Sequence, residues 1–133
     1  MSRNDFDDEK IISYWITEAH EAVEVAIHLM EKEDYSYALF FGHLAVEKTL
    51  KALFVSRHKK HAPPIHNLVR LANLCKVRLN EKRIEQLLVI TSFNLEARYP
   101  DITREFRKKC TRTFASENMS DVLEVIKWLG KMV

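Results

Sequence analysis

Hydrophobic residues recur at intervals of three and four along most of the chain, which is the period of an α-helix with one buried face. This pattern predicts five helices, spanning about Lys10 to Lys32, Tyr35 to Arg57, Asn67 to Cys75, Glu81 to Arg98 and Glu117 to Met132. Short connections would join most of them. The expected fold is therefore all-α, a five-helix up-and-down bundle with a short third helix.

The second predicted helix is apolar on more than one side, which is typical of a helix at the centre of a bundle or in an oligomer interface. We expect a homodimer that uses its additional apolar face. Gly42 lies inside this helix, where glycine costs about 1 kcal/mol relative to alanine. The close approach of another helix, or of a ligand, would account for it.

Polar residues mark the expected helix ends. Asp34, Asn80 and Ser116 are candidate N-caps for the second, fourth and fifth helices. Pro100 is expected to end the fourth helix. Residues 99–115 then form a long basic connection, and a loop of this length in a compact domain is often functional or disordered.

Composition supports a single folded domain over residues 1–133. Hydrophobic residues make up 47% of the chain, which argues against disorder. Only 2 glycines and 3 prolines are present, too few for the many turns of a β-sandwich. The first ten residues are polar and acidic, unlike a signal peptide, and no apolar run is long enough to span a membrane. We therefore expect a cytoplasmic protein with reduced thiols at Cys75 and Cys110.

Charge is distributed unevenly. Residues 1–50 hold 11 acidic and 4 basic side chains, whereas residues 51–112 hold 5 acidic and 15 basic ones. The basic middle of the chain suggests an anionic partner such as phosphate or nucleic acid. An equally good interpretation is that the two parts pair with each other in the fold or across a dimer.

Two stretches carry recognisable motifs. The first is Ala45-Val46-Glu47-Lys48-Thr49-Leu50-Lys51-Ala52, followed by Pro64-Ile65-His66-Asn67-Leu68; the second is Ala97-Arg98-Tyr99-Pro100-Asp101. Together they resemble the HEPN family of helical domains. They occur in the family's order, and the resemblance covers nearly the whole chain. It implies a helical bundle that usually dimerises and is often encoded beside a small nucleotidyltransferase. Family members are described as nucleotide-binding modules, as toxins of toxin–antitoxin pairs, or as metal-independent RNases.

The chain departs from the pattern of the RNases, which carry an Arg-x(4–6)-His motif at a dimer cleft. Arg98 matches the arginine, but the positions expected for histidine hold Thr103, Arg104 and Glu105. The general acid–base partner for attack by a 2′-hydroxyl is thus missing from the motif. His43 or His66 could supply it in space. We favour binding over catalysis and assign no catalytic residue.

Arg98, Tyr99 and Asp101 are candidate ligand-binding residues at the end of the fourth predicted helix. A guanidinium offers a planar set of donors to phosphate, although Arg98 could instead pair with Asp101 or with a helix C-terminus. Tyr99 could stack on a base, or pack at the edge of the core. Asp101 could orient Arg98, or cap the following turn.

Lys48, Lys51, Glu47 and His66 complete the candidate set. A lysine on an apolar helix either extends to solvent or meets an anion, and the four-residue spacing of Glu47 and Lys51 also predicts a plain ion pair. His66 could bind a ligand, titrate near neutral pH or, as we favour, cap the third helix. The spacing of the histidines is unlike that of a metal site, so we expect no metal and no cofactor.

The expected function is therefore that of a nucleotide-binding protein or a partner of a small nucleotidyltransferase, in a toxin–antitoxin-like pair. Two alternatives stay open. One is a metal-independent RNase toxin that uses Arg98 with a non-standard histidine, and the other is a structural dimeric interaction module.

Overall fold

The computed structural model describes residues 6–133; the first five residues of the predicted domain lie outside this range. The helices are α1 (Asp8–Glu31), α2 (Tyr35–His58), α3 (Leu68–Leu74), α4 (Glu81–Thr91), the 3₁₀ turn η1 (Leu95–Ala97), α5 (Pro100–Lys109) and α6 (Arg112–Gly130). No strand occurs among the described residues. The prediction of an all-α protein is confirmed, and the prediction of five helices is wrong because α5 was not foreseen.

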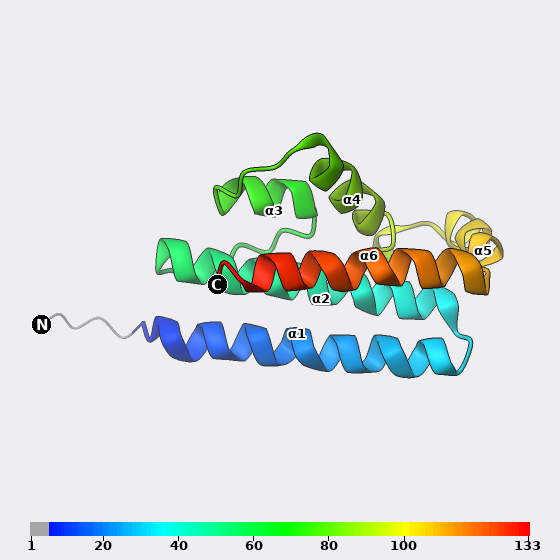
Figure 1. The fold of residues 1–133 in the computed structure, drawn as a ribbon, viewed down its shortest axis with the longest axis horizontal. Helices are drawn as coiled ribbons and strands as arrows, with labels where there is room; N and C mark the ends of the chain where they lie inside the picture. The colour runs from blue at the N-terminus through cyan, green and yellow to red at the C-terminus, as the bar shows by residue number, and fades with distance from the viewer. Residues whose placement is uncertain (1–5) are drawn as a thin grey trace, which may run out of the picture.

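Helices α1 and α2 form a long antiparallel hairpin (Figure 1). Helix α1 begins where the Asp7 carboxylate accepts a hydrogen bond from the Lys10 backbone N–H at 3.2 Å. Asp8 and Glu9 follow in its first turn, where negative charge opposes the helix dipole. Asp34 occupies the N-cap position of α2 as predicted, but its side chain makes no capping hydrogen bond.

Helix α6 lies against α2 and runs in the same direction (Figure 1). The two helices start together, where the Arg112 side chain donates to the Tyr35 hydroxyl at 3.1 Å. They approach each other closely at Gly42, where a Cβ atom would meet a Val122 methyl carbon at 3.2 Å. The glycine therefore permits close helix packing, one of its two predicted roles. Because α2 and α6 are parallel, the bundle is not a simple up-and-down one.

Helices α3 and α4 cover a further side of α2 (Figure 1). One face of α3 packs into the core, where Leu68, Leu71, Ala72 and the following Cys75 are all buried. Asn80 caps α4 as predicted, accepting from the Arg83 backbone N–H at 2.8 Å.

The fourth helix ends earlier than predicted, at Thr91 instead of Arg98. Leu87 and Ile90 form its buried face, whereas Ile84 and Leu88 are exposed. After Thr91 the chain turns inward and buries Phe93 and Leu95, which a continued helix could not place together in the core.

The predicted basic connection at residues 99–115 is mostly helical. Pro100 begins α5 instead of ending the preceding helix, because proline's fixed φ suits the first helical position and its missing N–H is not needed there. Helix α6 begins at Arg112, where the Thr111 hydroxyl accepts from the Phe114 backbone N–H at 3.2 Å. The predicted cap Ser116 lies inside α6, so that prediction is wrong.

The core surrounds α2. Sixteen of its residues are buried by the other helices of the same chain, and the less buried positions Tyr37, Phe41, Leu44 and Lys48 form one stripe along it. The central position predicted for this helix is thereby confirmed. No helix within residues 6–133 combines the length and the apolarity needed to cross a membrane.

Candidate functional site

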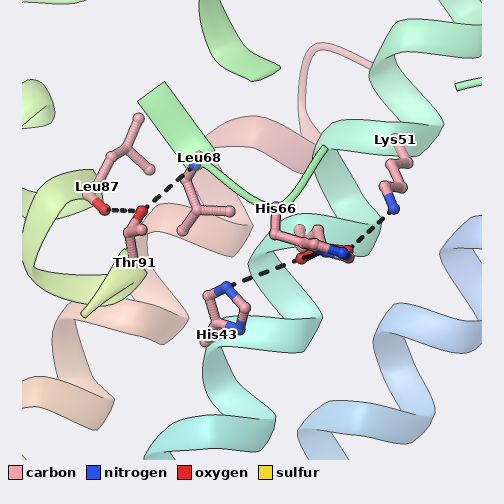
Figure 2. Close-up of polar contacts among 7 residues, drawn as sticks. His43, Lys51, His66, Leu68, Leu87 and Thr91 are labelled. Carbon is pink, nitrogen blue, oxygen red and sulfur yellow. Dashed lines mark hydrogen bonds and ion pairs between the residues drawn. The ribbon is translucent and has the colours of Figure 1, made fainter. Parts of the chain in front are cut away.

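A buried carboxylate, Glu47, organises the polar centre of the protein. His43, Glu47 and Lys51 follow one another at intervals of four on α2, so they share one face of that helix. One Glu47 oxygen lies 3.0 Å from Lys51 Nζ, and the other lies 3.8 Å from His43 Nε2. Figure 2 shows that His43 and Lys51 approach His66, which lies in the segment before α3.

His66 pairs with Glu47 and does not cap α3. Its Nδ1 lies 3.1 Å from both oxygens of the Glu47 carboxylate. The cap of α3 is the neighbouring Asn67, whose side chain accepts from the Arg70 backbone N–H at 2.9 Å. The side chain of His66 remains 63% exposed, so the face of the ring turned away from Glu47 is open to solvent. The favoured capping role of His66 is therefore wrong.

His43 is fully buried, and neither of its ring nitrogens has a hydrogen-bond partner. Burial lowers the pKa of His43 below its usual value of 6.5, although Glu47 and the backbone of His66 act to raise it. The ring is therefore neutral near pH 7, with one donor and one acceptor nitrogen. A buried imidazole without partners is unusual, because such groups normally form at least one hydrogen bond.

The two candidate lysines have separate surroundings. Lys51 forms the predicted ion pair with Glu47, and its ammonium lies 5.3 Å from the centre of the Trp15 ring on α1. Lys48 pairs instead with Glu18 of α1 at 2.9 Å. The structure thus places Lys48 between α1 and α2, and it lines none of the pockets described next.

Three adjoining pockets open beside this centre. The histidine pocket, about 250 Å³, is lined by His43, Leu44, Glu47, His66, Asn94, Glu96 and Ala97. The tyrosine pocket, about 470 Å³, is lined by His66, Asn67, Thr91, Asn94, Ala97, Arg98, Tyr99 and Ile102. The arginine pocket, about 360 Å³, is lined by Arg98, Pro100, Thr103, Arg104 and Arg107. Shared lining residues connect the three in this order, and we call them together the cleft.

A hydrogen-bonded junction holds one wall of the cleft together. The Thr91 hydroxyl donates to the Leu87 carbonyl at 2.7 Å and accepts from the Leu68 backbone N–H at 3.3 Å (Figure 2). The end of α4 is thereby tied to the start of α3. Residues Asn94 to Ala97 follow, anchored in the core by the buried side chain of Leu95. Asn94 and Ala97 line both the histidine and the tyrosine pocket.

The arginine pocket contains three cations and no carboxylate among its lining residues. Arg107 is held against α2, where it donates to the Tyr37 hydroxyl and lies 5.0 Å from the centre of that ring. Within residues 6–133, the side chains of Arg98 and Arg104 have neither a hydrogen bond nor an ion pair. Two guanidinium groups are thus available to an anion, for which their fork of donors is well suited.

The structure brings most of the predicted site residues together. Arg98, Tyr99 and His66 line the same pocket, and Tyr99 is 77% exposed there. Asp101 makes no ion pair with Arg98 and lies in the first turn of α5, where its charge suits the helix dipole. Sequence reasoning missed Asn94, Glu96 and Arg107, because nothing in the local pattern distinguishes them from ordinary surface residues.

No group of three or more His, Cys, Asp or Glu side chains within the described residues is arranged to hold a metal ion.

Comparison with known proteins gives two matches. The model of a family described as HEPN domain matches residues 12–132. The crystal structure of TT1696 from Thermus thermophilus has the same fold, with a TM-score of 0.75 and 22% sequence identity over 92% of this chain and 98% of that one. No curated protein matches the chain.

Proposed function

Because this chain belongs to the HEPN family, we propose that it is a nucleotide-binding protein whose ligand occupies the cleft. The observation that carries the proposal is the arginine pocket, where the side chains of Arg98 and Arg104 have no partner within residues 6–133 and no carboxylate is among the lining residues. A phosphate there would receive charge-assisted hydrogen bonds, which are about twice as strong as neutral ones.

The neighbouring tyrosine pocket supports the same proposal. It begins at Arg98, is large enough for a sugar and a base, and exposes the Tyr99 ring as a stacking surface. Asn67, Asn94 and His66 add polar atoms along its wall. A nucleotide would therefore place its base and sugar in the tyrosine pocket and its phosphate in the arginine pocket, with Arg98 between the two.

Calorimetric titration with ATP and GTP tests the proposal. Arg98→Ala should weaken binding by about 10- to 100-fold, the worth of a hydrogen bond to a charged group, while the circular dichroism spectrum stays unchanged. Arg70→Ala is the matched control, since Arg70 is an exposed arginine of α3 outside the cleft. Absence of nucleotide binding, or equal affinities of the two variants, would overturn the proposal.

RNA cleavage is a second candidate, and one observation favours it. His66 and Arg98 line the same pocket, and Glu47 accepts from Nδ1 of His66, which leaves Nε2 able to take a proton. In this reaction the 2′-hydroxyl would give its proton to Nε2 while its oxygen bonds to phosphorus. The bond to the 5′-oxygen would break, and that oxygen would take a proton from water.

Incubating short RNA with the protein in the presence of EDTA tests this second candidate. Cleavage products carrying a 2′,3′-cyclic phosphate, and their loss in His66→Ala, would support it. Intact RNA, or cleavage that persists in His66→Ala, would exclude His66 as the base.

A nucleotidyltransferase partner, a toxin–antitoxin pairing and a homodimer are proposed from the family resemblance alone. Co-expression with a small nucleotidyltransferase encoded beside this chain, followed by purification of the complex, tests the first two. Sedimentation equilibrium tests the third, and a monomer at micromolar concentration would count against it.

A further inference from the structure

The histidine pocket at the inner end of the cleft is lined by polar groups that the protein itself leaves unused. His43 is fully buried, its two ring nitrogens form no hydrogen bond within residues 6–133, and Figure 2 shows its ring directed toward His66. The side chains of Asn94 and Glu96 also have no partner within residues 6–133. Both line the pocket, held there by Leu95, which is buried in the core between them.

The polarity of the cleft changes from end to end. Glu47 and Glu96 line the inner, histidine pocket, whereas Arg98, Arg104 and Arg107 line the outer, arginine pocket. A complementary ligand would carry hydrogen-bond donors at one end and negative charge at the other. A nucleotide has this polarity when its sugar and base occupy the tyrosine pocket, the hydrogen-bonding edge of the base reaches the adjoining histidine pocket, and its phosphate lies in the arginine pocket.

We infer that the histidine pocket selects guanine over the other bases, an inference that rests on the proposed nucleotide binding. Guanine presents two adjacent donors, N1–H and the N2 amino group, beside the acceptor O6. The two oxygens of the Glu96 carboxylate match the donors, and the Asn94 amide can donate to O6. Glu47 is already engaged by Lys51 and His66, so Glu96 is the free carboxylate of this pocket.

Adenine fits the same groups poorly. Its corresponding edge has a single amino donor beside an unprotonated ring nitrogen, whose lone pair would face the carboxylate. Because Glu96 is exposed, water can solvate its carboxylate when adenine binds, so the discrimination comes from the charge-assisted hydrogen bonds that only guanine forms. The free carboxylate therefore gives the pocket a basis for choosing between purines.

Titration of the whole protein with GMP, IMP and AMP tests the inference. IMP differs from GMP only by the missing 2-amino group, so it reports that one contact. GMP should bind about 10-fold more tightly than IMP, which is the lower end of the worth of one hydrogen bond to a charged partner, because Glu96 is exposed. AMP should bind no better than IMP.

Glu96→Gln identifies the residue responsible. The glutamine amide offers one acceptor and one donor, so it should remove the preference for GMP over IMP. Glu117→Gln, an exposed carboxylate of α6 outside the cleft, should retain that preference. Unchanged circular dichroism spectra will establish that both variants are folded.

The remaining outcomes separate the two proposals. Equal affinities for GMP, IMP and AMP, with binding still lost in Arg98→Ala, would overturn guanine selection and leave nucleotide binding standing. A preference for GMP that survives Glu96→Gln would also overturn the assignment. Failure of all three nucleotides to bind would overturn both proposals.

Discussion

Removing the charge of Glu47 should destabilise the protein more than any other single change of charge in the cleft. The side chains of Glu47 and Lys51 are only 6% and 9% exposed, and their charged atoms lie 3.0 Å apart. In Glu47→Gln the Lys51 ammonium loses its carboxylate and keeps only the Trp15 ring, 5.3 Å away, as a compensating group. Leaving one partner of a buried pair uncompensated costs about 3–5 kcal/mol.

The residual exposure of Lys51 places the expected cost at the lower end, about 3 kcal/mol. Urea unfolding followed by circular dichroism at 222 nm measures it, provided that the slope of the free energy against urea stays constant. Lys48→Met is the matched control. It breaks the Lys48–Glu18 pair of 2.9 Å, whose side chains are 23% and 31% exposed, and should cost less than about 1 kcal/mol.

The double variant Glu47→Gln, Lys51→Met shows whether Glu47→Gln is destabilised by the uncompensated charge of Lys51 or by altered packing at position 47. Replacing both charges together is often close to neutral, so the double variant should recover most of the stability lost in Glu47→Gln. Two results would refute the reasoning. One is a cost for Glu47→Gln no larger than that of Lys48→Met, and the other is a double variant no more stable than Glu47→Gln.

Three further predictions concern packing, capping and pH, and chemical unfolding measures each. Gly42→Val should lower the free energy of unfolding by about 1–3 kcal/mol, because its side chain would meet buried Val122; no loss would mean that α6 shifts freely. Thr111→Ala should cost about 1 kcal/mol and Ser116→Ala almost nothing, since only Thr111 caps α6; the reverse order would move the start of the helix. Burial lowers the pKa of His43 below 6.5, so at acidic pH this imidazole binds a proton more readily in the unfolded chain than in the folded protein. Stability should therefore fall as pH drops below about 6.5, less so in His43→Gln, and equal pH slopes would contradict this.

Sequence periodicity predicts the helices that bury a regular stripe and fails where the chain leaves that pattern. Helices α1, α2 and α3 were predicted to within a few residues because their apolar positions follow one helical period. The apolar residues beyond Thr91 continue a similar spacing, so the fourth helix was predicted seven residues too long. Helix α5 was missed because its apolar face consists of only Ile102 and Phe106, too few among its charged residues to give a periodic pattern.

The candidate site shows the same division. Arg98, Tyr99 and His66 could be singled out from local motifs, and the structure brings them to one pocket. Asn94 and Glu96 belong to the cleft only because the chain turns inward after α4, a tertiary event without a local signal. His43 carries one readable signal, its four-residue spacing from Glu47, but sequence cannot show that its ring nitrogens are left without partners.

An amide NMR titration of the ¹⁵N-labelled protein with GMP tests the central claim, nucleotide binding in the cleft, most directly. The account predicts saturable shifts concentrated at residues 66–67, 94–99 and 104–107, with the amides of α1 unmoved. Absence of saturable shifts, or shifts centred on α1, would contradict it.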